Sequence, residues 1–423
     1  MSNLILKDCC SFQEGYVNPT QTIRTYFDGP IKWLRASDLN DSLVFKTEKT
    51  LSIDGFNSAG KSAFLFKKNT IAISKSGTIG SLGILKDEMC GNRAVINIDV
   101  NTDVSDLYYV FYTLKYKKNE IISKSGGSIQ KNLYVSALET ISLNHNNLAI
   151  QKQIASVLYS LDSKIEINNR INSELEAMAK TLYDYWFVQF DFPDAEGKPY
   201  KRSGGKMVWN EELKRMIPVR WTSGELQEIA NIKMGQSPPG ESYNNDGDGM
   251  IFYQGCTDFG NRFPTIRQFT TEPTRFAKEG DILLSVRAPV GTLNLAKEDC
   301  CIGRGLSALN SKDNCIAYLF GVMVNLKQIF DRRNVDGTTF GSITKDDLFS
   351  LKVVRPEKDI LKQYHSIINP TFEKQNKIAL ENIQLSSLRD WLLPMLMNGQ
   401  VKVGEDKESE LSMAAEPKTK YGK

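Results

Sequence analysis

The chain has 423 residues, of which 41% are hydrophobic and 24% charged, a composition typical of a soluble globular protein that is too long for a single core. It excludes an intrinsically disordered chain, and no run of about 18 apolar residues predicts a membrane-spanning helix. The net charge of +3 is small for a domain that binds nucleic acid through charge alone, so such a partner is permitted but not required.

The N-terminus and the cysteines predict a protein of the cytoplasm. The first residues, MSNLILKDCC, reach a charge at Lys7 without the apolar core of a signal peptide. The seven cysteines are odd in number and form no CxxC pair. This usage is typical of reduced thiols rather than of a disulfide framework or a zinc site.

Residues 1–146 predict a first mixed α/β domain. Short apolar runs between Gly, Asn and Asp clusters predict strands at 31–35, 70–74, 81–85, 94–98 and 138–143. A helical face over 103–118 has Asp103 placed to cap it. A Gly/Ser-rich loop precedes the last strand, which leads directly into a helical stretch.

Residues 147–190 predict this helical stretch. Its apolar positions, which begin at Ile150, recur every three or four residues and keep one face toward a partner. Ser163 and Glu166 form a capping box. We therefore expect a short helix followed by a long one over 161–190, about 42 Å in length at 1.5 Å per residue.

The second half of the chain repeats the first. After a polar connector, residues 191–217, the segment 218–356 again predicts a mixed α/β domain. The segment 357–400 again predicts a helical stretch. Its apolar stripe, the row of apolar positions along one helix face, begins at Ile360, 210 residues after Ile150. The chain is therefore predicted to be a tandem duplication.

Matched residues identify the parts that the two halves share. Gly15, Trp33 and Asp38 match Gly235, Tyr253 and Asp258 at an offset of 220, and Ser74, Gly80, Cys90 and Arg93 match Ser285, Gly291, Cys301 and Arg304 at an offset of 211. The change of offset places a length difference between Asp38 and Ser74. We interpret the matched parts as scaffold and the differing part as a variable loop.

The second helical stretch also contains a start signal. Asn369 followed by Pro370 predicts an N-cap and a first helical residue, so a long helix is expected over 371–398. The chain returns to this helix by its shortest uncrossed route if the two long helices pack antiparallel. The predicted fold class is therefore α+β, a tandem duplication of a mixed α/β domain plus a long helix, with the helices forming a coiled-coil-like bar.

Asn172 and Asn382 occupy the same position in the two helical stripes. A buried asparagine in a helix seam weakens packing but fixes register and partner, so we predict that this pair sets the helix register. After the bar, the tail 401–423 has no apolar period and is predicted to be disordered.

Residues 55–62, GFNSAGKS, match the phosphate-binding pattern GxxxxGK[ST]. A true phosphate-binding loop needs a helix immediately after it, so that the helix N-terminus faces the anion. Here Lys67, Lys68 and Asn69 lead instead into a β-branched run. We favour a basic variable loop that contacts a nucleic-acid backbone, and retain a nucleotide-binding enzyme as the alternative.

Basic and amide side chains recur near loops of both predicted domains. The candidates for DNA contact are Lys61, Lys75, Arg93, Lys124, Gln130, Lys131 and Asn132 in the first domain and Arg262, Arg267, Arg287, Arg304, Arg332, Arg333 and Lys345 in the second. Such side chains recognise bases or contact phosphates. No paired carboxylates, metal cluster or nucleophile with a base at usable spacing predicts catalysis.

The sequence resembles the specificity subunits of type I restriction-modification systems. The resemblance rests on AIQKQIASVLYSLDSKIEINNRINSELEAMAKTLYDYWF, on IPVRW with GQSPPGESY, on the pair ISKSGTIG and LLSVRAPVG, and on LRDWLLPMLMNGQV. These stretches cover nearly the whole chain in the family's order. The first domain lacks the IPVRW lead-in, so its first strand is expected to be short or missing.

The resemblance implies a non-catalytic subunit that recognises double-stranded DNA at a bipartite target. Two target-recognition domains would each recognise one half, and the helices would separate them and bind two methyltransferase subunits. Restriction and motor subunits would complete the complex, and S-adenosylmethionine and ATP would bind those partners, leaving this chain without a cofactor. A coiled-coil scaffold with no DNA preference is a further alternative.

Overall fold

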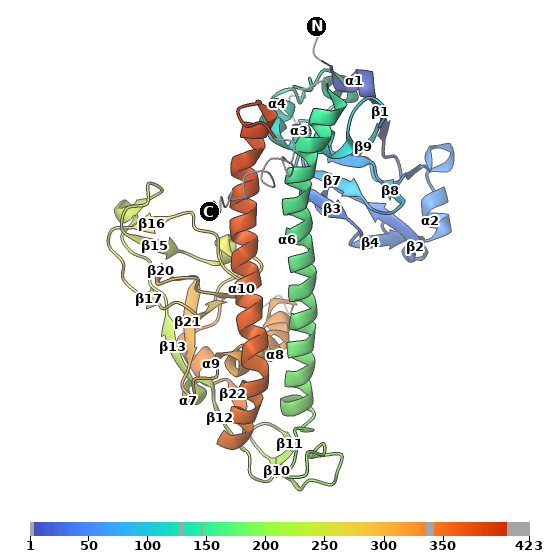
Figure 1. Cartoon of the computed structure of the whole chain (residues 1–423). Helices are drawn as coiled ribbons and strands as arrows, with labels where there is room; N and C mark the ends of the chain where they lie inside the picture. Colours follow the sequence, from blue (N-terminus) through green and yellow to red (C-terminus); the bar gives the residue numbers. More distant parts are fainter. Residues whose placement is uncertain (1–3, 127–130, 145–146, 336–341, 404–423) are drawn as a thin grey trace, which may run out of the picture. The chain divides into compact units, whose positions relative to one another are not determined.

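The computed structural model describes residues 4–126, 131–144, 147–335 and 342–403, without the side chains of 328, 329 and 332–335. The chain divides into two compact units, Met1–Glu166 with Gln384–Lys423 and Ile167–Ile383. Each unit contains one β-rich domain and part of both long helices (Figure 1). The domain boundaries inferred from the sequence are a different division and stay predictions.

The β-rich domain of the first unit contains two sheets. The five-stranded sheet has the order β1 (Cys10–Glu14), β9 (Val95–Val100), β6 (Ile71–Ser74), β7 (Leu82–Leu85) and β3 (Ser42–Val44), and the four-stranded sheet has the order β4 (Lys49–Leu51), β2 (Phe27–Leu34), β8 (Met89–Gly91) and β5 (Leu65–Phe66). All pairs are antiparallel except β3 with β7 and β2 with β8. Strands β2, β6, β7 and β9 confirm the four predicted apolar runs between residues 31 and 98.

Short helices cover the five-stranded sheet of the first unit. They are α1 (Leu6–Cys9), α3 (Leu107–Tyr116), α4 (Lys118–Ser123) and α5 (Val135–Glu139), while α2 (Ile53–Asn57) and the 3-10 turns η1 (Arg24–Tyr26), η2 (Ala36–Asp38) and η3 (Gly60–Ser62) lie in the loops. The apolar face of α3 packs with β6, β7 and β9 in one core. Its N-cap is Asp106, which accepts a hydrogen bond from the Tyr109 amide at 2.9 Å, and not Asp103 as predicted.

The second unit repeats this arrangement. Its four-stranded sheet has the order β13 (Ala230–Met234), β21 (Leu306–Ser311), β18 (Ile282–Ser285) and β19 (Leu293–Leu295), and its five-stranded sheet has the order β14 (Tyr243–Asn244), β16 (Phe269–Thr270), β15 (Met250–Tyr253), β20 (Cys300–Ile302) and β17 (Phe276–Ala277). Two antiparallel two-stranded sheets are added. They are β10 (Met207–Asn210) with β11 (Arg215–Pro218), and β12 (Thr222–Glu225) with β22 (Lys352–Arg355). The helices and turns are η4 (Asp184–Val188, a π-helix), α7 (Leu226–Ile229), η5 (Gly240–Ser242), η6 (Cys256–Asp258), α8 (Ile316–Val335) and α9 (Lys345–Phe349).

Matched backbone hydrogen bonds demonstrate the duplication. The Lys75 amide donates to the Ala94 carbonyl at 2.7 Å, and the Val286 amide donates to the Gly305 carbonyl at 2.9 Å. Leu133 donates to the Lys75 carbonyl at 2.9 Å, and Ile343 donates to the Val286 carbonyl at 2.8 Å. Both bonds recur at the offsets of 210 and 211 residues, so the same loops converge in both domains.

The two long helices are continuous, which makes the predicted breaks wrong. Helix α6 covers Leu148–Tyr183 and α10 covers Lys358–Met397, with 36 and 40 residues. Their lengths are therefore about 54 Å and 60 Å at 1.5 Å per residue, not the expected 42 Å. Ser163 and Pro370 both lie inside helices, and the side chain of Asn369 donates to Glu373 Oε1 at 2.7 Å instead of capping.

The breaks fail because capping signals are local, whereas the helix is held by its whole apolar stripe. An isolated cap contributes about 1 kcal/mol. Burial of several Leu or Ile side chains against a partner helix contributes more than that for each side chain. Packing along the stripe therefore outweighs both the capping box and the proline.

Within each unit the long helices pack antiparallel (Figure 1). In the first unit, Asn144, just before α6, donates to the Met397 carbonyl at 2.8 Å, and Asp162 pairs with Arg389 at 2.6 Å. In the second unit, Asn168 pairs with Asn382 and Asn172 with Gln375. Residue numbers rise along α6 as they fall along α10 in both units, so the predicted antiparallel pairing is confirmed.

The strand predicted at 138–143 is absent. Its residues form the end of α5 and a single bridge between Ile5 and Ser142. The second domain has the full pair β12–β22 at the equivalent place. Within the described residues, the chain after α5 therefore has one bridge where the second domain has a strand pair.

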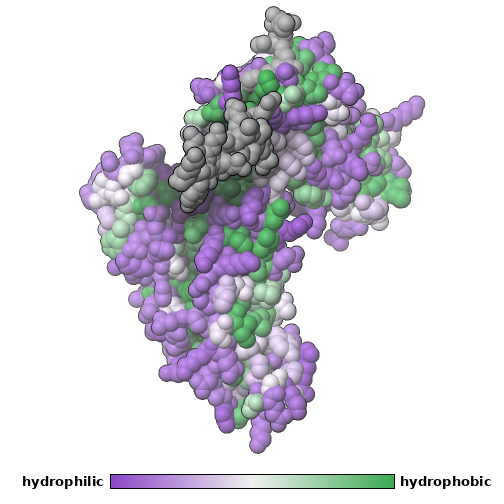
Figure 2. Space-filling view, in the orientation of Figure 1, coloured by the Kyte–Doolittle hydropathy of each residue, from purple (hydrophilic) through white to green (hydrophobic). Residues whose placement is uncertain are grey.

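The face of the molecule that Figure 2 draws is largely polar. Figure 2 shows mostly hydrophilic residues on the face that is drawn, with smaller hydrophobic areas between them. Among the described residues, no helix combines the length and the apolar character needed to cross a bilayer.

Candidate nucleic-acid interface

Three of the predicted arginines in the second domain line one pocket. Arg267 precedes β16, Arg287 follows β18 and Arg304 follows β20. The pocket has a volume of about 240 Å³ and also includes Asp258 and Gln254. Loops that are separate in the sequence therefore converge on one cationic hollow.

Short polar contacts position these arginines. Arg267 Nε lies 2.9 Å from Asp258 Oδ1, and the Asp258 side chain is only 9% exposed whereas that of Arg267 is 65% exposed. Arg304 donates from its amide to Ser237 Oγ at 3.3 Å. The Arg287 carbonyl accepts from Ser285 Oγ at 2.7 Å. The lining contains three arginines and one carboxylate, so the pocket attracts groups rich in negative charge or in hydrogen-bond acceptors.

Several pocket residues were missed by the sequence analysis. They are Ser237, Gln254, Cys256 and Thr257, and Asp258 was identified only as scaffold. Gln254 follows the buried end of β15 and is exposed. Its counterpart in the first domain is the buried Leu34. The duplication therefore gave no signal for it.

The first domain places a related set of side chains at the matched loops. The Arg93 amide donates to Asn18 Oδ1 at 3.4 Å, as Arg304 does to Ser237, and Arg93 is exposed. Lys75 pairs with Glu14 at 2.9 Å. The hydrogen bonds from Leu133 to Lys75 and from Lys75 to Ala94 bring the loops of Lys75, Arg93 and Asn132 together.

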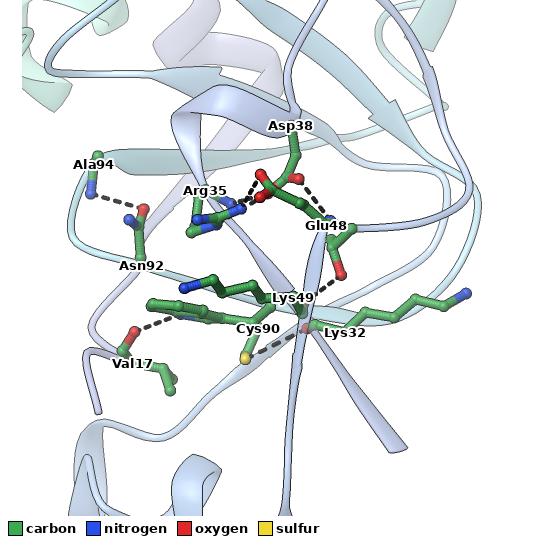
Figure 3. A network of polar contacts seen from close by, with 11 residues as sticks. Val17, Lys32, Arg35, Asp38, Glu48, Lys49, Cys90, Asn92 and Ala94 are labelled. Carbon is green, nitrogen blue, oxygen red and sulfur yellow. Dashed lines mark hydrogen bonds and ion pairs between the residues drawn. The ribbon is translucent and has the colours of Figure 1, made fainter. Parts of the chain in front are cut away.

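A network beside these loops involves an arginine that the sequence analysis did not select. Figure 3 shows the side chains of Arg35, Asp38 and Glu48 pointing toward one another. Arg35 Nη2 lies 2.6 Å from Glu48 Oε2, and Arg35 Nε lies 3.7 Å from Asp38 Oδ2. The guanidinium of Arg35 also lies 5.6 Å from the ring centre of Trp33. Asp38 accepts from the Glu48 amide at 2.9 Å and so ties the loop after β3 to η2.

The remaining candidates are dispersed. Lys61, Lys131 and Lys345 are exposed, and Lys345 lies 5.3 Å from the Phe349 ring centre. Lys124 donates to Thr140 Oγ1 at 3.0 Å. Gln130 lies outside the described residues, as do the side chains of Arg332 and Arg333, whose backbone belongs to α8.

Arg262 is not part of the exposed set. Its side chain is 4% exposed, and its guanidinium lies 4.4 Å from the ring centre of Phe372 on α10. It donates to Asn376 and lies 4.0 Å from Glu176 on α6. Burial lowers the pKa of Arg262 to about 10, which leaves it charged at neutral pH. In this conformation it connects the loop before β16 to the long helices and does not face solvent.

The two asparagines of the helix stripe both lie between the helices, but they do not pair with each other. Asn382 accepts from Asn168 Nδ2 at 2.8 Å, and Asn172 donates to the Gln375 carbonyl at 3.3 Å. Within the described residues, Asn172 Oδ1 and Gln375 Nε2 are buried without a hydrogen-bond partner. That Asn172 and Asn382 set the register stays a prediction, and these contacts add Asn168 and Gln375 to the polar part of the seam.

The phosphate-binding pattern does not adopt the required conformation. Gly55 is buried inside α2, and Ser52 caps this helix by accepting from the Gly55 amide at 3.1 Å. Lys61 lies in the short turn η3, after which the chain continues to β5. The helix thus precedes the lysine instead of following it, and the geometry gives the nucleotide-binding alternative no support.

Known proteins resemble the chain in sequence and in fold. Residues 3–177 and 218–386 match the type I restriction modification DNA specificity domain. The MjaX sequence of Methanocaldococcus jannaschii, assigned as a type I restriction enzyme specificity subunit, is 31% identical over 72% of this chain and 70% of its own. The MjaIX specificity subunit of the same organism is 26% identical over 92% of this chain and 91% of its own.

A solved structure has the same fold. The S subunit of a type I restriction-modification system from M. genitalium aligns with a TM-score of 0.56 and 18% identity, over 93% of this chain and 95% of that one. The structure and the comparisons agree on the organisation of the chain. Both show two copies of one domain, and the structure adds the paired long helices. The chain therefore belongs to the type I restriction-modification DNA specificity family and carries its specificity domain twice.

Proposed function

We propose that each β-rich domain recognises one half of a bipartite DNA target. The observation that carries this proposal is the matched placement of Arg93 and Arg304 on loops that converge in the same way in both domains. Exposed arginines on such loops suit the major groove and the phosphates that flank it. The modest net charge of +3 fits if partner subunits neutralise further phosphates.

We also propose that the chain is non-catalytic and docks two methyltransferase subunits and the restriction and motor subunits. S-adenosylmethionine and ATP would then bind those partners, in the cytoplasm. The family membership supports this division of labour, because the specificity domain supplies recognition to a complex. The exposed apolar side chains on the long helices, Ile167, Met178, Ile367, Leu388 and Trp391, offer surface for such partners.

A domain exchange tests the recognition proposal. Residues 218–356 are replaced by the corresponding segment of the MjaIX subunit, and the DNA selected by the complex with its methyltransferase subunit is sequenced. We expect one half of the bipartite target to change and the other half to persist, which also shows that the chimera has folded. A change in both halves, or in neither, would contradict separate recognition.

The paired helices should determine the spacer between the two halves. Seven residues inserted after Asn172 and seven after Lys374 keep the heptad phase of the seam on both helices. They add about 10 Å, which corresponds to roughly three base pairs of B-DNA. We expect the selected spacer to lengthen while both half-sites stay the same. Altered half-sites with an unaltered spacer would refute this role of the helices.

A further inference from the structure

The pair of Asp258 and Arg267 differs from the other charged groups of the pocket. The Nε of Arg267 lies 2.9 Å from Asp258 Oδ1, and the Arg267 side chain is 65% exposed. The carboxylate is nearly buried and lies on the turn η6, directly after β15. A nearly buried carboxylate therefore contacts the Nε edge of the guanidinium, while most of the Arg267 side chain stays accessible to solvent.

We propose that Arg267 recognises a guanine in the half-site bound by the second domain, with Asp258 as its positioning residue. The terminal nitrogens of an arginine form a planar fork that matches the O6 and N7 acceptors of guanine in the major groove. Contact with Asp258 restricts the rotation of the long side chain before DNA arrives, which reduces the entropy lost on binding. The inference rests on the proposed function, DNA recognition by the second domain, and names the residue that makes the contact and the base that it recognises.

The neighbouring arginines are placed for a different contact. Within the described residues, no salt bridge is formed by Arg287 or Arg304, and the Nε of Arg304 lies 3.4 Å from the neutral Ser237 Oγ. Their guanidinium groups are not aligned by a carboxylate. A less restricted cation suits phosphate contacts, which are tolerant of orientation.

Among the described residues of the first domain, the counterpart of this carboxylate has no arginine with an equivalent free fork beside it. Asp38 is the counterpart of Asp258, but the arginine beside it is Arg35, three residues earlier in the chain. Arg35 has contacts to both Asp38 and Glu48, and its side chain is only 19% exposed. Arg35 Nη2 donates to Glu48 Oε2 at 2.6 Å, and the side chain is mostly buried. One terminal nitrogen of the fork is therefore already used, so guanine recognition by this mechanism is expected in one half-site only.

The residue matched to Arg35 explains why the second pocket is open. This residue is Gly255, and a Cβ atom built there would meet no atom within 4 Å. The second domain thus has no side chain at the position from which Arg35 reaches the carboxylate in the first. Arg267 reaches the same carboxylate position from the following loop and leaves the hollow accessible to a base.

The test compares three variants in the complex of the full chain with its methyltransferase subunit. Arg267→Lys keeps the charge and removes the fork, Asp258→Asn removes the positioning carboxylate, and Arg220→Ala is a matched control. Arg220 lies in the same unit, is 79% exposed and is 3.8 Å from Glu357. Bound DNA is selected from a random library, and base preference is measured at every position of both half-sites.

We expect Arg267→Lys to lower the preference for guanine at one position of one half-site by at least about tenfold, with the other half-site and the spacer unchanged. Asp258→Asn should weaken the same position to a smaller extent, and Arg220→Ala should leave all positions unchanged. The persistent half-site reports that the variants are folded. An unaltered guanine preference in Arg267→Lys, or a uniform loss over both half-sites, would overturn the inference. A wild-type complex that selects no bipartite motif would overturn the proposed function with it.

Discussion

Replacement of Pro370 by alanine should stabilise the protein. Pro370 lies inside α10, where it cannot donate a hydrogen bond to the preceding turn and its ring crowds the backbone. An interior proline costs a helix about 3 kcal/mol relative to alanine. The added flexibility of the unfolded chain offsets about 0.5–1 kcal/mol of the gain. We therefore expect the free energy of unfolding to rise by roughly 2 kcal/mol in urea titrations.

Pro356 provides the control, because it lies outside the helices, just after β22. Its replacement by alanine removes only the restriction of the unfolded chain and should lower stability by about 0.5 kcal/mol. Opposite signs for the two variants are the expected signature of a continuous α10. If Pro370→Ala lowers stability as Pro356→Ala does, the helix begins at this proline and the continuous helix is refuted.

Replacement of Arg262 by alanine should destabilise the second unit. The guanidinium lies 4.4 Å from the Phe372 ring centre, donates to Asn376 and contacts the Phe372 carbonyl at 3.5 Å. Its removal takes away the hydrogen bond to Asn376 and the packing on Phe372, beside a cavity of about 640 Å³. Loss of a buried charged hydrogen-bond network with its packing costs about 2–4 kcal/mol. We do not expect a loss in the upper part of that range. Glu176, the carboxylate that loses its partner, is 50% exposed and stays in contact with water.

Arg267→Ala is the matched control for Arg262→Ala, since both residues belong to the same loop. Arg267 is 65% exposed, so its loss should change the free energy of unfolding by no more than about 0.5 kcal/mol. Its effect should instead appear in DNA selection. A loss of stability for Arg267→Ala equal to that for Arg262→Ala would contradict the different placement of the two arginines.

The sequence predicted the repeated scaffold well because that scaffold depends on local pattern. Short apolar runs between turn residues predicted β2, β6, β7 and β9, whose inward side chains are buried. The duplication added a second, independent signal, because Arg93 and Arg304 follow matched strands. The helix breaks were mispredicted, since the cap signals at Ser163 and Asn369 act over one turn and the stripe acts over the whole helix.

The site was predicted less completely because exposure depends on contacts distant in the sequence. Arg262 and Arg267 are both basic loop residues in the sequence. Contacts with Phe372 on α10, 110 residues later, and with Glu176 on α6 bury Arg262 and so separate their environments. The periodicity of apolar residues could not predict the pairing of Asp258 with Arg267 either, because both residues lie outside regular strands and long helices. The duplication could not reveal it either, since Asp38 contacts an arginine from a different position.

The most direct measurement of bipartite recognition is a footprint of the assembled complex on DNA selected from random sequence. The account predicts two protected motifs separated by a gap of constant length, with sequence preference inside the motifs and none in the gap. Uniform protection without a preferred sequence, as expected of a coiled-coil scaffold that binds DNA without selection, would contradict it.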